Sequence, residues 1–301
     1  MQLDVKNSFF RTEYNISFAN LTDLYNYIKS NPAINAEVFK TRASLNPVDD
    51  FHGERLSDCI EWCFGGYEKG LDNFLVNSLK LKESIVDVSD SRRYVRSLYG
   101  GVPIPPLVAA NVPDSMARYD IDKSLVTRNI YFSLSYDCTT TYNQIVNRGL
   151  ATLFIIQALE EKRQIIDLKA EELVRVYDEY VRIDVGLKKP GDLCLDISKC
   201  YFPMVSREFL RRLLFRVLES VPVKNHEWDY SYGKIIPYEE LREILELKED
   251  DLLIGGPRQM GIKGDDVYDD TISMIKKLGL EAEFDLDKIQ SFKEKGYQYV
   301  R

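Results

Sequence analysis

The chain has only two histidines, His52 and His226, which stand far apart in its 301 residues. Neither lies in a recognisable catalytic pattern, and the Gly-x-Ser-x-Gly elbow of the serine hydrolases is missing. The glycine patterns of dinucleotide and nucleoside triphosphate sites, Gly-x-Gly-x-x-Gly and the ending Gly-Lys-Ser/Thr, are missing as well. The sequence shows no intact catalytic motif, so we expect a protein that binds no cofactor and favour a non-enzymatic role.

Cysteine is sparse too. The five cysteines form no regular framework, and an odd count is typical of a reducing compartment. Cys59 and Cys63 stand four residues apart, but a zinc site would need two more ligands. We therefore expect buried free thiols and no bound metal.

Long apolar runs are missing. None reaches the roughly 18–20 residues that cross a bilayer, and the longest, around 150–159, is interrupted by Thr152 and Gln157. The N-terminus lacks the basic and apolar regions of a signal peptide. These features predict a soluble, cytoplasmic protein that does not contact membranes.

Positive charge is in deficit, since the net charge is −8 and the pI is near 5.1. Phosphate binding depends on lysine and arginine, so nucleic acid is an unlikely partner for such a chain. The one basic cluster consists of Arg92, Arg93 and Arg96, with Tyr94 and Tyr99 between and after them. It could contact nucleic acid or an acidic protein surface, although a solvated loop is the simpler interpretation.

What the sequence does contain is an alternating α/β pattern after Arg128. Apolar strands and amphipathic helices follow one another in the segments 129–135 (strand), 140–162 (helix), 163–168 and 180–187 (strands), 206–220 (helix), 251–254 (strand) and 265–277 (helix). The second and third strands are joined so closely that they must pair antiparallel. The pattern predicts an α/β fold with a mostly parallel sheet and helices on both faces.

We expect two domains, a mixed α+β N-terminal region over 1–125 and an α/β domain over 126–301. Strands 129–135 and 251–254 should lie in one sheet. The predicted core consists of apolar residues from each element: Leu134, Leu153, Phe154, Ile183, Leu213, Leu214, Val217, Leu253, Ile254 and Ile275.

The segment 100–113 is rich in glycine and proline but otherwise apolar. Its four prolines exclude a continuous helix and a central strand. Because the segment is apolar, it is expected to pack against another apolar surface. Ordinary packing on the N-terminal region is one alternative, and docking on a partner or a second copy through Leu107 is the other. We favour a homo-oligomer, because symmetric dimers are the commonest solution.

The element order resembles the von Willebrand factor A fold or, more generally, a Rossmann-like sheet. That resemblance implies a divalent metal after the first strand, held by Asp-x-Ser-x-Ser. Here Ser133 and Ser135 keep the serine spacing, but Tyr131 stands where the aspartate belongs. Without that carboxylate the cation loses a charged ligand. Asp137 could supply the missing carboxylate if the motif were shifted along the chain. The alternative is that both serines belong to an ordinary strand end and hold no metal.

A second candidate site follows the last predicted strand, where Gly255 and Gly256 precede Pro-Arg258. Glycines between a strand and a helix can hold phosphate on backbone N–H groups. However, the next helix opens with Asp265 and Asp266, whose carboxylates would repel a phosphate. A tight turn at the edge of the sheet is therefore the preferred interpretation.

Segments 99–118, 147–160 and 209–215 resemble a family of uncharacterised bacteriophage proteins. The points of likeness are the glycine-proline loop ending in Met116, the pair Arg148-Gly149 and the run Phe-Leu-Arg-Arg-Leu-Leu-Phe. The resemblance implies a viral origin and assigns no activity.

The leading hypothesis is a phage-encoded, non-enzymatic protein that binds a host or viral protein in the host cytoplasm, in immune evasion or virion assembly. Its support is the missing catalytic motif, the many aromatic residues and the apolar proline loop. The alternatives are a diverged metal-dependent hydrolase or nuclease at Ser133, Ser135 and Asp137, and a nucleic-acid-binding protein using the arginine cluster.

Overall fold

A computed structural model provides the structure of the protein. It describes residues 2–7, 12–32, 48, 53–72, 74–75, 78, 84–85, 93–97, 102–103, 105–110, 115–120, 127–176, 179–192, 194–220 and 235–294. The statements below concern these residues. Among them, no helix combines the length and apolarity needed to cross a membrane.

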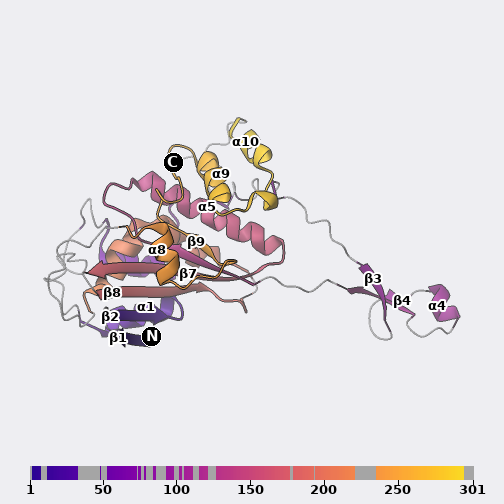
Figure 1. Ribbon diagram of the computed structural model, residues 1–301, viewed down its shortest axis with the longest axis horizontal. Helices are drawn as coiled ribbons and strands as arrows, with labels where there is room; N and C mark the ends of the chain where they lie inside the picture. Colours follow the sequence, from indigo (N-terminus) through magenta and orange to yellow (C-terminus); the bar gives the residue numbers. More distant parts are fainter. Residues whose placement is uncertain are drawn as a thin grey trace.

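The main structure is a six-stranded sheet of order β1-β2-β8-β7-β6-β9 (Figure 1). Parallel pairing joins β6 to both β7 and β9, and β2 to β8, while β1–β2 and β7–β8 are antiparallel. The strands are β1 (Gln2–Asn7), β2 (Thr12–Phe18), β6 (Thr127–Ser133), β7 (Ile165–Val176), β8 (Glu179–Lys188) and β9 (Leu252–Ile254). The predicted α/β class with a mostly parallel sheet is confirmed, including the antiparallel pair. The strands β6 and β9 lie in one sheet as predicted, and they are neighbours in it.

One face of this sheet carries the main core. Alternate strand residues such as Ile130, Phe132 and Ile183 are fully buried there, as expected for strands whose side chains alternate between faces. The helices that contribute to this core include α1 (Leu21–Ser30), α2 (Leu56–Gly65), α5 (Tyr142–Glu161), α6 (Ile197–Val205), α9 (Val267–Lys277) and α10 (Leu286–Glu294), and the helical segment 209–218 contributes as well. All ten predicted core residues are buried.

The other face is covered by α8 (Tyr238–Ile244) over only part of its area. Leu241 and Leu245 pack on Leu173, Tyr180 and Leu253 to form a small second core. Farther along this face, towards β2 and β1, Glu13, Asn15 and Ser17 stay partly accessible and Asp4 is exposed. The sheet therefore presents an open polar face next to α8.

The amphipathic segment predicted as one helix over 206–220 differs in the structure. It contains a π-helix, Phe209–Leu214, followed by the short helix α7 (Phe215–Leu218). Three of its arginines, Arg211, Arg212 and Arg216, are buried. Arg212 donates to the backbone carbonyl of Gly53 at 3.1 Å, and Arg216 donates to that of Asn31. Wider π winding and these long-range bonds turn the arginines inward, which helical periodicity alone does not reveal.

The proline-rich segment lies in a separate three-stranded sheet of order β3-β5-β4, which stands apart from the six-stranded sheet in Figure 1. Its strands are β3 (Arg93–Ser97), β4 (Val102–Pro103) and β5 (Met116–Asp120), and one short helix, α4 (Pro105–Ala109), follows β4. Pro103 sits on an edge strand and Pro105 begins a helix, both positions that proline tolerates. The predicted division into 1–125 and 126–301 stays a prediction, although β1 and β2 are hydrogen-bonded into the main sheet.

Candidate functional site

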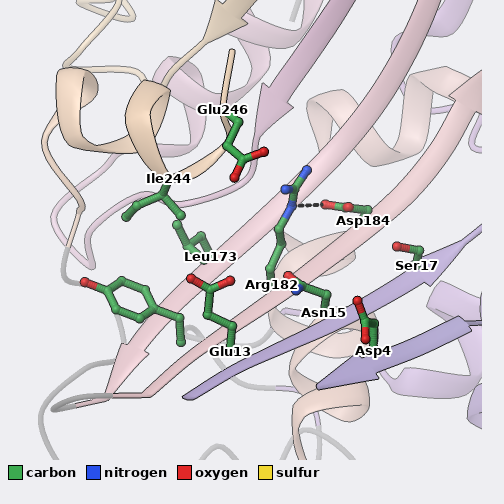
Figure 2. Close-up of a pocket in the computed structure, with 10 residues that line it drawn as sticks. Asp4, Glu13, Asn15, Ser17, Leu173, Arg182, Asp184, Ile244 and Glu246 are labelled. Atoms are coloured by element: carbon green, nitrogen blue, oxygen red, sulfur yellow. Dashed lines mark hydrogen bonds and ion pairs between the residues drawn. The ribbon is translucent and has the colours of Figure 1, made fainter. Parts of the chain in front are cut away.

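The candidate site is a groove of about 310 Å³ on the open face of the main sheet (Figure 2). Strands β1, β2, β7 and β8 form its floor, and the end of α8 forms one wall. The lining residues are Asp4, Glu13, Asn15, Ser17, Leu173, Tyr180, Arg182, Asp184, Ile244 and Glu246. The volume lies at the lower end of the range of small-ligand pockets, which run from roughly 300 Å³ upward, so it suits one or two side chains.

Strand alternation explains why these side chains share one face. On β8, Arg182 and Asp184 point into the groove, while Ile183 between them is fully buried in the main core. The parallel register then places Asn15 of β2 opposite Arg182 and Ser17 opposite Asp184. Two strands that are distant in the sequence thus form one polar surface.

Arg182 occupies the centre of the groove and binds two carboxylates. Its Nη2 donates to Oε1 of Glu171 at 2.6 Å, and its Nε donates to Oδ1 of Asp184 at 2.8 Å. Burial alone would lower the pKa of Arg182, but the two carboxylates raise it above its ordinary value. The guanidinium therefore stays charged and fixes both carboxyl groups in place.

Glu171 lies beneath the groove rather than in its lining. It is almost fully buried and stands directly opposite Asp184 in the antiparallel pair β7–β8. Burial, together with the neighbouring Asp184, raises the pKa of Glu171 to about 8, although Arg182 acts in the opposite direction. A raised pKa of this kind is typical of functional carboxyl groups as well as of buried structural ones.

Acidic groups outnumber basic ones in the groove. Around the single guanidinium of Arg182 stand four lining carboxyl groups, contributed by Asp4, Glu13, Asp184 and Glu246. Leu173 and Ile244 add an apolar wall, and Asn15 and Ser17 add neutral hydrogen-bonding groups. The arrangement suits a ligand that is positively charged and has an apolar stem, such as an arginine or lysine side chain.

The sequence-predicted residues meet at another place, the carboxyl ends of β6 and β9. Arg148 of α5 is fully buried, and its Nη1 donates to the carbonyls of Ser133 at 2.8 Å and Gly255 at 2.9 Å. A Cβ added to Gly256 would lie 2.7 Å from the carbonyl oxygen of Ser135. The two strand ends are thus tied together, and Gly255 and Gly256 precede a turn over 257–261.

Behind this turn lies a second buried carboxyl group. The Oγ of Ser135 donates to Oε2 of Glu172 at 3.1 Å. Burial raises the pKa of Glu172 to about 8, although the hydrogen bond from Ser135 and the charge of Arg148 lower it. Arg148 also lies over the Phe132 ring, with its guanidinium carbon 4.3 Å from the ring centre. The serines therefore take part in a packed structural cluster.

Asp137, the candidate metal ligand, is bound by its own loop. Its Oδ1 accepts from the backbone N–H of Thr139 at 2.9 Å and from its Oγ1 at 2.6 Å, and its Oδ2 pairs with Nη1 of Arg258 at 2.9 Å. These bonds outweigh burial and hold the pKa of Asp137 below its usual value. A guanidinium thus occupies one carboxylate oxygen, and no group of metal-ligating side chains was found within the described residues.

The remaining predicted residues lie in the smaller sheet. Arg93 and Arg96 are on β3, but their side chains and the whole of Arg92 lie outside the described residues. Leu107 is half-buried in α4, a helix with no buried residue, and its neighbour Val108 is 48% exposed. The structure therefore brings Ser133, Ser135, Asp137, Arg258 and the two glycines together, and it places Arg93, Arg96 and Leu107 elsewhere.

Sequence reasoning missed the groove. Its one visible signal was the alternation of Tyr180, Arg182 and Asp184 with apolar residues, which indicates a strand with one polar face. The partners from β1 and β2 could not be assigned, because β2 pairs with β8 across more than 160 residues of sequence and β1 joins the sheet through β2.

Comparison with known proteins gives one match. The model of a family described as Domain of unknown function (DUF7192) matches residues 4–282. No curated protein matches the chain, and no solved structure does. The matched range includes both the groove and the carboxyl ends of β6 and β9.

Proposed function

The chain belongs to the DUF7192 family, and we propose that it is a non-enzymatic binding protein that holds a positively charged segment of a partner protein. The observation that carries this proposal is the groove on the open sheet face, where four lining carboxyl groups surround Arg182. Opposite charges on facing surfaces accelerate encounter and select the partner.

The position of the groove also favours an extended protein segment over an isolated ion. Strand β1, which contributes Asp4, forms one edge of the main sheet. An extended peptide can add a strand to such an edge through backbone hydrogen bonds and place alternate side chains over the sheet face. A basic side chain from that peptide would then lie beside Asp4, the lining residue that β1 contributes.

Charge reversal in the groove tests this proposal. The variant Asp4→Lys/Glu246→Lys changes two exposed lining carboxyl groups and leaves Arg182 and its partners unchanged. The probe is a fluorescent hexa-arginine peptide, followed by anisotropy. We expect the variant to bind the peptide at least about tenfold more weakly than the native protein, because it exchanges two attractive charges for repulsive ones.

The matched control is Glu249→Lys/Asp250→Lys, which makes the same change in net charge at exposed positions outside the groove lining. Its affinity should stay within about threefold of the native value, because exposed charges beyond a Debye length of about 8 Å are largely screened. Equal weakening in both variants would show that only net charge matters, and the proposal would be rejected. A native protein that fails to bind the peptide would reject it as well.

The proposal extends to origin and location. We propose that the protein is phage-encoded and acts in the host cytoplasm on a host or viral protein, in immune evasion or virion assembly. The support is the likeness of segments 99–118, 147–160 and 209–215 to bacteriophage proteins. A likeness to the von Willebrand factor A fold is supported only by the order β8-β7-β6-β9 with its antiparallel β7–β8 pair.

We further propose a homo-oligomer in which a second copy covers α4. The support is that none of the residues in α4 is buried, although Leu107 and Val108 are apolar. The metal-dependent hydrolase and nucleic-acid-binding alternatives stay predictions. Neither is favoured by a contact in the part of the chain that the structure describes.

A further inference from the structure

We infer that Glu171 holds a proton that it shares with Asp184, and that a cation entering the groove releases this proton. The inference rests on the proposed function, since it concerns how the same groove responds to its ligand. It assigns a role to a buried carboxyl group that touches the groove only through Arg182 and Asp184.

The hydrogen-bonding geometry favours a proton at this position. Oε1 of Glu171 accepts from Arg182, but its buried Oε2 has no donor partner. The Asp184 carboxyl, directly opposite on β8, lies within hydrogen-bonding reach of Glu171. Two carboxylates side by side repel each other, and a buried acceptor without a donor is costly. A proton on Glu171 removes both penalties, because the protonated group donates to Asp184.

Charged and titratable groups surround this pair on every neighbouring element. Arg182 supplies the positive partner of both carboxyl groups. Tyr131 of β6 faces Glu171 and Arg182, and its own pKa is raised by burial and by nearby carboxylates. Three further acids, Asp4, Glu13 and Glu246, line the groove. The ammonium group of Lys169 lies over the ring of Tyr131. The acids disfavour a second negative charge at Glu171.

A bound cation reverses this balance. An ammonium or guanidinium near Asp184 stabilises the ionised form of Glu171, so the proton leaves to solvent and the carboxylate remains paired with Arg182. Linkage is reciprocal, so binding that releases a proton must tighten as pH rises towards about 8, the pKa of Glu171 before the cation enters. The groove would thus bind its partner more weakly in acidic surroundings.

The test uses a cation built into the protein, which makes it independent of any partner. Ser17 lines the groove and is paired with Asp184 in the parallel register, so Ser17→Lys places an ammonium beside that carboxyl group. Glutamate carboxyl carbons are labelled with ¹³C and titrated by NMR, and the signal that disappears in Glu171→Gln identifies Glu171. In the native protein this signal should titrate near neutral or slightly alkaline pH.

In Ser17→Lys the proton dissociation constant of Glu171 should rise at least about tenfold, because a nearby opposite charge typically shifts a carboxyl pKa downward by one to three units. The control is Asn26→Lys, an exposed position on α1, a helix of the main core on the opposite face. It should leave the titration unchanged. Two results would overturn the inference, namely a Glu171 signal already ionised below pH 6 in the native protein, or one that is insensitive to Ser17→Lys.

Failure of this test is distinguishable from failure of the proposed function. If hexa-arginine binds to the groove but Ser17→Lys leaves the titration of the Glu171 signal unchanged, the binding proposal is supported and the proton linkage is rejected. If the linkage is observed and the peptide does not bind, the shared proton stands and the partner chemistry is wrong.

Discussion

Replacing Glu172 with glutamine should make the protein more stable at neutral pH and flatten the dependence of its stability on pH. Glu172 is buried on the core face beside Ser135 and Arg148, and its pKa is raised from an ordinary value of 4.5 to about 8. Below about pH 4.5 the group is protonated in both the folded and the unfolded chain. Between 4.5 and 8 only the unfolded chain ionises, so the folded state loses stability as pH rises.

The magnitude follows from this interval. Each pH unit within it lowers the free energy of unfolding by about 1.4 kcal/mol for one such group. At pH 7 the cost of keeping Glu172 protonated is therefore on the order of 3 kcal/mol. Glutamine resembles the protonated acid in shape and can still accept the hydrogen bond from Ser135, but it does not ionise in either state. The variant should recover most of that cost at pH 7 and little of it at pH 4.5.

Urea denaturation at several pH values between 4.5 and 8 provides the measurement, with the slope m as a check on two-state behaviour. The control Glu249→Gln removes an exposed carboxyl group and should leave the pH dependence as in the native protein. The reasoning would be refuted if Glu172→Gln were less stable than the native protein at pH 7, or if the two curves stayed parallel over the whole interval.

Three further predictions concern the other sites. Leu107→Asp should convert an oligomer into a folded monomer, because α4 has no buried residue in the chain itself. Light scattering would show this, and a monomeric native protein at micromolar concentration would contradict it. Gly256→Ala should lower the free energy of unfolding by about 1–3 kcal/mol, because it forces a Cβ against a backbone carbonyl. Gly191→Ala, where a Cβ would meet nothing within 4 Å, should change it little, and equal melting curves for the two variants would contradict this. Asp137→Ala should not alter the effect of millimolar Mg²⁺ or Mn²⁺ on the melting temperature, because Thr139 and Arg258 already bind the carboxylate. If the metal stabilised the native protein but not the variant, Asp137 would be a metal ligand and the prediction would be wrong.

The sequence predicted those features that depend on local periodicity. The alternation of apolar residues in β6 and the run of α5 identified strand, helix and core, because burial of one face sets the period of each element. The close approach of Gly256 to the carbonyl of Ser135 needs a residue without a Cβ, which the sequence provides. The site residues at the ends of β6 and β9 came together because parallel strands end at one edge of a sheet.

The groove could not be predicted, because it depends on pairing between β2 and β8. That pairing determines which residues stand beside Arg182, and neither strand encodes its partner locally. The π-helix was missed for a related reason. Its buried arginines are satisfied by the carbonyls of Gly53 and Asn31, which belong to distant segments. Long-range hydrogen bonds thus decided both features.

The most direct test of the account is to map where a basic peptide binds. Hexa-arginine is added to ¹⁵N-labelled protein, and the backbone amide shifts are followed by NMR. We predict that the largest changes fall on residues 13–17 of β2 and 180–184 of β8, around Arg182. Changes centred instead on Ser135, Asp137 and Arg258, or on α4, would contradict the assignment of the groove as the binding site.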